Sequence, residues 1–125
     1  MNKPIPLGVE HKKKKVTVKI FKDVKSALPK AIIMDGYNMR GKSRGIADAV
    51  RSMLNSKGWE SVLVSELELK PDGQDVFTMP KTLMTQITSE ICRINIEHPS
   101  LNPTQSAIIR AAINRRLIGF YKKVD

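Results

Sequence analysis

Polar and apolar residues alternate strictly between Lys15 and Ile20. Side chains of a β-strand point alternately to its two faces, so this pattern predicts a strand with one buried and one exposed face. A similar run at 74–79 predicts a second strand that ends at Pro80. The two runs align at an offset of 59 positions, which pairs Thr17 with Val76.

Two longer segments carry apolar residues three and four positions apart, which is the spacing of one face of an amphipathic helix. They are 41–54 and 104–117. At an offset of 63 positions they superimpose, and Ser43 pairs with Ser106 near the start of each. The chain is therefore expected to contain one small unit twice.

Another helix is expected ahead of each of these segments. The first runs from about Asp23 to Ile32. It contains Pro29, which lacks a backbone N–H and therefore predicts a kink or a later start. The second carries apolar residues over 83–94 and is stopped by His98-Pro99.

Glycines mark the expected ends of the two amphipathic helices. Gly58 would occupy the C′ position of the first, and Gly119 would end the second. Trp59 and Phe120 each follow one of these glycines and are expected to fill the core beneath the corner. Between the two halves, 61–69 alternates weakly and predicts a short extra strand.

These elements predict a mainly α fold with a two-stranded antiparallel ribbon, built from two strand-helix-helix repeats. A strand and two helices cannot bury enough surface alone, so the two copies should pack together as an intramolecular pseudo-dimer. The expected organisation is a disordered basic arm (1–14), repeat 1 (15–58), an acidic linker (59–73), repeat 2 (74–119) and a tail (120–125).

The net charge of the chain indicates which class of partner it binds. The chain has 22 Lys and Arg against 12 Asp and Glu, a net charge of +10. Such a balance favours a polyanion, with nucleic acid first and an anionic membrane second. Segment 59–80 holds one basic and five acidic residues, whereas 16–58 holds nine and three and 81–125 holds seven and three. An acidic linker therefore separates two basic modules.

Few residues of the chain are candidates for disulfide, membrane or metal chemistry. Cys92 is the single cysteine, so no disulfide forms within the chain and a reducing cytoplasm is the expected setting. We expect this thiol to be buried on the core face of a helix. No apolar run approaches the roughly 20 residues that span a bilayer, and the N-terminus lacks an apolar signal core. His11 and His98 lack ligand-spaced partners, so no zinc site or other cofactor is indicated.

The repeated strand-helix-helix order resembles the ribbon-helix-helix family of DNA-binding proteins, which includes the Arc and methionine repressors. The resemblance is carried by the alternation at 15–19, by Met79-Pro80 at a strand-to-helix corner, and by the helices at 41–54 and 104–117. In that family two strands pair antiparallel and enter the major groove of DNA. Because both copies lie on one chain, the protein is similar to the tandem members of the family, which include a conjugation accessory protein.

Elementary physics supports the same arrangement. Pairing the two strands satisfies backbone groups that a lone strand would leave open, and a two-stranded ribbon fits a major groove about 12 Å wide. Lysine suits guanine, glutamine suits adenine, and a methyl group can meet the thymine methyl. The residues expected to read bases are Lys15, Thr17, Lys19, Gln74, Val76 and Thr78. Because the two triads differ, the DNA site should not be a perfect palindrome.

Phosphate contacts are expected at the starts of the two amphipathic helices, since a helix N-terminus attracts anions. In the family these positions bind the DNA backbone on either side of the ribbon. The expected residues are Lys42, Ser43, Arg44, Gln105 and Ser106, together with Lys12, Lys13 and Lys14 of the basic arm. Whether Gly41 or Ser43 caps the first helix stays open at this point. The alternative is that these are ordinary first-turn residues and solvated charges.

Two enzyme hypotheses can be drawn from the region 31–43. Gly36 to Ser43 matches the phosphate-loop pattern G-x-x-x-x-G-K-[ST] and follows the apolar run 31–34. A nucleotide-binding domain would, however, need several parallel strands. Segment 31–38 is also similar to the strand-end DGYN of PIN-like ribonucleases, which need clustered carboxylates for Mg²⁺ or Mn²⁺. The acids Glu66, Glu68, Asp72 and Asp75 stand in no recognisable order for such a site.

The sequence thus predicts a non-enzymatic protein that binds double-stranded DNA sequence-specifically, located in the cytoplasm on the nucleoid. It would act as a transcriptional regulator, or as an accessory protein that marks an origin on a mobile element. Side-by-side self-association on DNA is compatible with either role. The alternatives are a nucleotide-binding enzyme and a metal-dependent ribonuclease.

Overall fold

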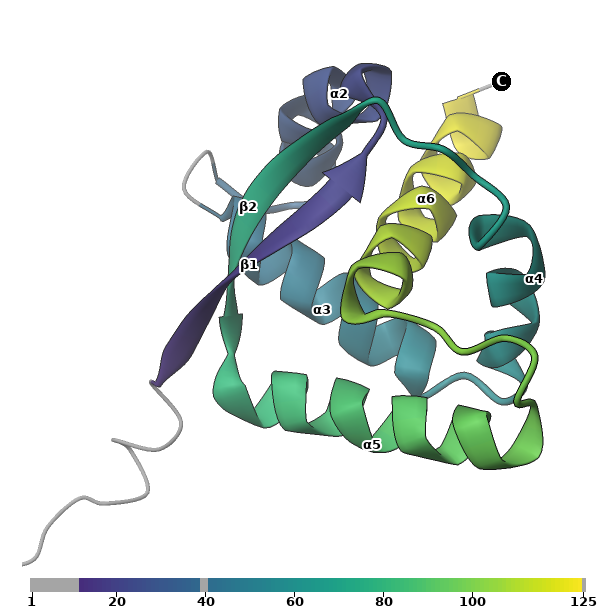
Figure 1. Ribbon diagram of the computed structural model, residues 1–125. Coiled ribbons are helices and arrows are strands. Elements are labelled where there is room, and N and C mark those ends of the chain that lie inside the picture. Colours follow the sequence, from purple (N-terminus) through teal and green to yellow (C-terminus); the bar gives the residue numbers. More distant parts are fainter. Residues whose placement is uncertain (1–11, 39–40, 125) are drawn as a thin grey trace, which may run out of the picture.

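The computed structural model of the 125-residue chain describes residues 12–38 and 41–124, and of residues 117–124 it describes only the backbone. Two strands, β1 (Lys13–Ile20) and β2 (Gly73–Pro80), pair antiparallel and form the one sheet of this described part. The helices are α2 (Lys22–Met34), α3 (Lys42–Leu54), η1 (Trp59–Val62), α4 (Leu63–Glu66), α5 (Lys81–Glu97) and α6 (Gln105–Val124) (Figure 1). The predicted class, mainly helical with a two-stranded antiparallel ribbon, is confirmed.

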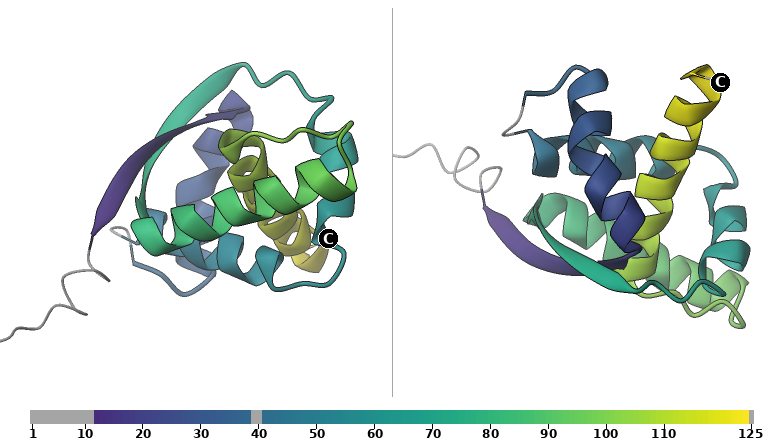
Figure 2. Two further views of the ribbon diagram at one scale, coloured as in Figure 1. Left: turned by 60° about the horizontal axis from the view of Figure 1, so that its bottom comes forward. Right: turned by 90° about the horizontal axis from the view of Figure 1, so that it is seen from above.

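The helices pack beside the ribbon, which lies at one side of the molecule (Figure 2). The packing crosses between the two halves of the chain. Helix α3 from the first half packs against β2, whereas α6 from the second half packs against β1. The helices α3 and α6 also pack against each other, so neither half has a core of its own.

One apolar core fills the space between the ribbon and the helices. The strands supply it with alternate residues, as the sequence pattern predicts: Val16, Val18, Ile20, Phe77 and Met79, each at most 8% exposed. The helices supply stripes spaced three and four apart, among them Ile46, Val50, Met53, Leu83, Ile87, Ile94, Ile109 and Ile113. Burial of these stripes fixes both the pairing of the strands and the side on which the helices lie.

Strand β1 begins two residues earlier than expected. Lys13 and Lys14 pair with Pro80 and Met79, so they belong to the ribbon and not to the N-terminal arm. The expectation was wrong because it placed these two lysines in the arm, although the strand predicted to end at Pro80 offers them partners. The other residues of the expected arm, apart from the exposed Lys12, lie outside the described residues.

Helix α2 continues through Pro29, so the later start that proline suggested is wrong. Its first residue, Lys22, is one position before the expected start. Leu28, Ala31 and Ile32 are buried on either side of the proline. We attribute the continuity to this packing, which offsets the one backbone hydrogen bond that proline removes.

Helix α3 begins after Gly41, which is its N-cap, so Ser43 is the second helical residue. The helix ends at the C-cap Asn55, and Gly58 is therefore not at the C′ position as expected. Gly58 does adopt a left-handed conformation, with φ +73°, where it precedes the 3₁₀ helix η1. Glycine takes this conformation without the steric cost that a Cβ atom would bring.

The acidic segment between the halves is helical and not the extra strand that its weak alternation predicted. Trp59, Leu63 and Glu66 are buried. Their spacing of four and three residues is that of a helix face. The segment forms a helix and not a strand because a single extra strand would have no neighbouring strand to pair with in this position. The segment packs against α6 as part of the same body.

Trp59 fills the core as predicted and is 5% exposed. Its indole N–H donates a hydrogen bond of 2.8 Å to Glu90 Oε1 on α5. Arg93 bridges Glu60 and Glu90 at 3.2 and 3.0 Å. The hydrogen bonds from Arg93 lower the pKa of Glu90, and those two carboxylates raise the pKa of Arg93. This cluster ties the acidic segment to α5.

Helix α5 ends at the C-cap His98, as predicted, because the residue before a proline disfavours the helical conformation. Helix α6 does not stop at Gly119 but continues to Val124, so most of the expected tail is helical. A single glycine costs a helix only about 1 kcal/mol and does not by itself end it. The side chain of Phe120 lies outside the described residues. No helix in the described part is long and apolar enough to cross a membrane.

Cys92 is exposed, so the prediction of a buried thiol is wrong. The buried residues of α5 are Leu83, Met84, Ile87 and Ile94. Cys92 lies five positions after Ile87, and five residues rotate a helix well past the buried face.

We expect a thiol reagent to label Cys92 fully in the native protein, without denaturant, because the reagent can reach an exposed thiol directly. Mass spectrometry would follow the labelling, with the urea-unfolded chain as the reference for full reactivity. Labelling that proceeds only at the rate of global unfolding would contradict this placement.

Candidate nucleic-acid interface

The outer face of the ribbon carries the six residues predicted to read bases. In the observed register Lys15 faces Thr78, Thr17 faces Val76 and Lys19 faces Gln74. Five of the six are exposed, including Val76 at 46%, and Thr78 is half-buried. The structure therefore brings both triads together on one accessible face, opposite the face that supplies the core.

The two serines predicted to bind phosphate hold the edges of the ribbon. The Thr78 N–H donates to Ser43 Oγ at 2.9 Å, and the Lys19 N–H donates to Ser106 Oγ, also at 2.9 Å. Each serine begins a helix in one half and bonds the strand of the other half. A serine oxygen that accepts one bond can still donate its own proton to an anion, so this role is compatible with a phosphate contact.

Lys42 has a partner within the protein. Its Nζ lies 3.0 Å from Asp75 Oδ2 and 5.2 Å from the centre of the Phe77 ring. The Asp75 side chain is only 14% exposed, so it neutralises part of the charge that was expected to meet a phosphate. Arg44 is exposed, and no ion pair involves it among the described residues.

Sequence reasoning missed a buried polar cluster beneath β1. Arg110 is 6% exposed, and its Nε donates to Glu66 Oε1 at 2.6 Å. Its Nη1 donates to the carbonyl of Lys19 at 3.1 Å. Asn114 Nδ2 donates to both carboxylate oxygens of Glu66, at 3.1 and 3.2 Å. The N–H of Lys19 is bound by Ser106, so helix α6 holds the main chain of this one residue on both sides.

A sequence signal for this cluster existed. Arg110 follows Ile108 and Ile109 on the apolar stripe of its helix, and Glu66 follows Leu63 by three positions. Charged residues at core positions are rare unless they are paired, so each predicts a buried partner. The sequence could not show that the two partners are each other, because they lie 44 positions apart.

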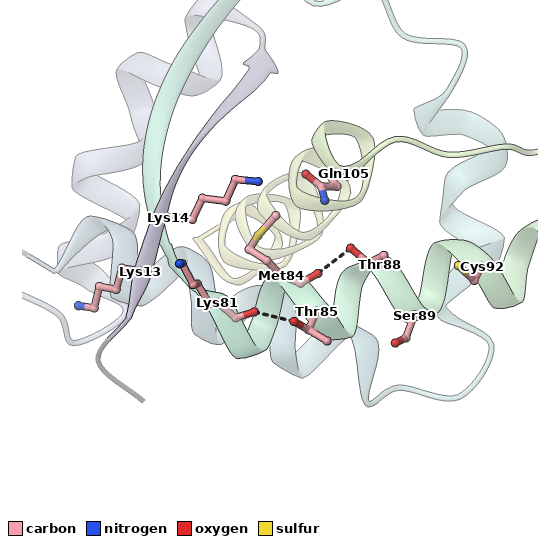
Figure 3. A pocket seen from close by; sticks show the side chains of 9 residues that line it. All are labelled: Lys13, Lys14, Lys81, Met84, Thr85, Thr88, Ser89, Cys92 and Gln105. Carbon is pink, nitrogen blue, oxygen red and sulfur yellow. Dashed lines mark hydrogen bonds between the residues drawn. The ribbon is translucent and has the colours of Figure 1, made fainter. Parts of the chain in front are cut away.

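Lys13 and Lys14, two of the three lysines predicted to bind phosphate from the arm, line an open groove of about 850 Å³ between the start of β1, helix α5 and the start of α6 (Figure 3). The groove is lined by Lys13, Lys14, Lys81, Met84, Thr85, Thr88, Ser89, Cys92 and Gln105. Lys81 was not predicted as a site residue, because its position at a strand-to-helix corner gave no sign of which surface it would join.

The phosphate-loop hypothesis requires a β-strand directly before Gly36, and the structure has a helix there. Residues 31–34 form the last turn of α2, and Gly36, with φ +99°, follows the helix end. The two strands of the described residues are antiparallel and far from this segment in sequence. Lys42, the lysine of the pattern, binds Asp75. Met39 and Arg40 lie outside the described residues.

The ribonuclease hypothesis also requires a strand at 31–34, which the structure does not have, together with free carboxylates. Asp35 follows a helix and not a strand, and it pairs with Arg116. Glu66 is bound by Arg110, and Asp72 accepts a hydrogen bond from the N–H of Lys22. Within residues 12–38 and 41–124, no three His, Cys, Asp or Glu side chains are grouped so that they could hold a metal ion.

Comparison of the chain with protein-family models, with curated proteins and with solved structures finds no match. Function is therefore inferred from the geometry of the ribbon, its charges and the polar contacts at its edges.

Replacing Arg110 by Met should destabilise the protein by about 3–5 kcal/mol, because the Glu66 carboxylate would stay buried without its cation. Arg115→Met is the matched control on the same helix. Its side chain is exposed and donates to Ser56 Oγ, so the change should cost less than about 1 kcal/mol. Urea unfolding measures both, and equal losses would contradict the buried role of Arg110.

Proposed function

We propose that this chain binds double-stranded DNA sequence-specifically by inserting the β1–β2 ribbon into the major groove, and that it does so as a tandem ribbon-helix-helix protein whose two halves form an intramolecular pseudo-dimer. The observation that carries the proposal is the register of the ribbon.

The register is the one that a twofold axis between two equivalent strands requires. Thr17 and Val76, which correspond at the offset of 59 in the sequence, face each other. The pair Lys15–Thr78 corresponds by the same offset to the pair Lys19–Gln74, with the strands exchanged. An axis through the central pair therefore relates all three outward pairs, as expected if each half supplies one strand of a pseudo-dimer.

The hydrogen bonds at the ribbon edges obey the same relation. Lys19 and Thr78 correspond at the offset of 59, and Ser43 and Ser106 correspond at the offset of 63. The two bonds, from Thr78 to Ser43 and from Lys19 to Ser106, have the same length of 2.9 Å. Two unrelated halves would have no reason to repeat this contact, so it supports a duplication.

The outer face suits the major groove in shape and in chemistry. A two-stranded ribbon fits a groove about 12 Å wide, and the six outward side chains include donors, an amide and methyl groups that match base edges. No helix of the described chain covers this face (Figure 2), and the net charge of +10 favours a polyanionic partner. The inward position of Asp75, bound to Lys42, keeps a carboxylate off the outer face.

Two biological roles share this binding physics: a transcriptional regulator and an origin-binding accessory protein of a mobile element. The same ribbon contacts serve both roles. Mapping the bound site to a promoter or to a nicking origin distinguishes them.

The test of the proposal compares Lys19→Ala and Thr78→Ala. If the strands read one asymmetric site together, each change should relax base preference at a different base pair and cost on the order of 1–3 kcal/mol of binding free energy. Selection from random duplex DNA would show the preference, and titration of the selected site would show the cost. Lys57→Ala, an exposed lysine beyond α3, is the control and should leave the selected sequence unchanged.

A swap of the two outward triads between the strands should reverse the preferred orientation of the site. If both single changes lower affinity without altering the selected sequence, the ribbon lies on the backbone and not in the groove, and the proposal is wrong.

A further inference from the structure

One surface beside the ribbon contains none of the six residues proposed to read bases. It is the open groove bounded by the first residues of β1, by α5 and by the start of α6 (Figure 3). On α5 the lining residues Lys81, Met84, Thr85, Thr88, Ser89 and Cys92 follow one stripe of the helix, about 16 Å long at 1.5 Å per residue. The groove is therefore elongated along the helix and is not a closed pocket for a small molecule.

The groove is positively charged, as judged from the residues that the structure describes. Lys13, Lys14 and Lys81 line it, no acidic residue does, and no ion pair involves any of the three within the described part of the chain. In Figure 3, Lys14 extends from β1 toward Gln105 at the start of α6. By contrast, Lys42, which begins the helix packed on β2, is paired with Asp75. Within the described residues, the β1 edge thus has three lysines without an ion pair, whereas at the start of the helix packed on β2 the exposed Arg44 is without one.

The remaining lining suits a sugar–phosphate chain. Thr85 and Thr88 donate their hydroxyl protons to the carbonyls of Lys81 and Met84, so both hydroxyls are occupied as donors. Beside them, the exposed Cys92 offers apolar surface, and the mostly buried Met84 lies at the base of the groove. Deoxyribose can lie on such surface while its phosphates meet lysine ammonium groups, which act as point charges without base preference.

The location follows from the duplex itself. A ribbon in the major groove has one phosphate backbone along each edge. The groove opens beside the β1 edge, where α6 packs. We propose that it binds the sugar–phosphate backbone of the DNA strand that runs past this edge, with Lys81 as a phosphate-binding residue. The inference rests on the proposed function. It adds to that function an asymmetry in phosphate binding, which is stronger along β1 than along β2.

The test is Lys81→Ala. The backbone N–H of Lys81 bonds to the carbonyl of Lys12, and truncation of the side chain keeps this bond, so the fold should stay intact. Thermal unfolding checks this point. Loss of one phosphate contact should reduce the slope of log K against log salt by about 0.9 and weaken all duplexes alike. The selected sequence should not change.

Phosphate ethylation gives the second measurement. In the wild-type complex, ethylation should interfere at phosphates of one strand beside the half-site read by β1, and Lys81→Ala should remove that interference. Lys57→Ala, exposed on another surface, is the charge-matched control and should alter neither the salt slope nor the ethylation pattern.

The outcomes separate this inference from the proposed function. If the wild-type chain selects no sequence and shows no salt dependence, the proposed function fails and this inference fails with it. If the wild-type chain selects a sequence but Lys81→Ala retains its salt slope and ethylation pattern, only the groove assignment is wrong. If Lys81→Ala abolishes binding of polyglutamate while DNA binding is unchanged, the groove takes an acidic protein segment, and the assignment is again wrong.

Discussion

The pairing of β1 with β2 is the interaction on which the rest of the structure depends. Two single strands would each leave a row of N–H and C=O groups without partners, and an isolated pair of strands is barely stable in water. Burial of alternate residues, with Phe77 and Val18 fully inaccessible, fixes the register of the pair. Once that register is set, helix α3 lies against β2 and helix α6 against β1. The two halves are therefore interlocked, and the outer face of the ribbon becomes available as a single surface.

The contacts beneath that surface are only partly symmetric. Each strand edge has one serine contact, but only Lys19 is also held through its carbonyl, by the buried Arg110, among the described residues. At the position that corresponds to Arg110 in the first half, 63 residues earlier, stands Ala47, which has no polar side chain. Three lysines without an ion pair among the described residues lie on the β1 side, whereas on the β2 side Lys42 is paired with Asp75 and Arg44 is exposed. Under the proposed function, these differences predict one preferred orientation on DNA.

The fold is largely predictable from the sequence because its main signals are local. Alternation predicts the strands, and apolar spacing predicts the helices. The duplication suggested by the constant offsets belongs to the proposal. The expectations that are wrong concern tertiary context. Pro29 and Gly119 suggest helix breaks, yet packing or the small cost of one glycine keeps both helices continuous. Cys92 lies further around its helix than the apolar stripe reaches. The link from Arg110 to Lys19 spans 91 positions and has no signature in a single sequence.

The central claim is that one chain reads one asymmetric DNA site with its own two strands. Binding-site selection on random duplex DNA with the wild-type chain, followed by titration of the selected site at several salt concentrations, tests it most directly. We predict one enriched, non-palindromic sequence, a complex with a single chain, and a slope of log K against log salt of about −4 to −5, as for about five neutralised phosphates. No enriched sequence together with a slope near zero would contradict the claim.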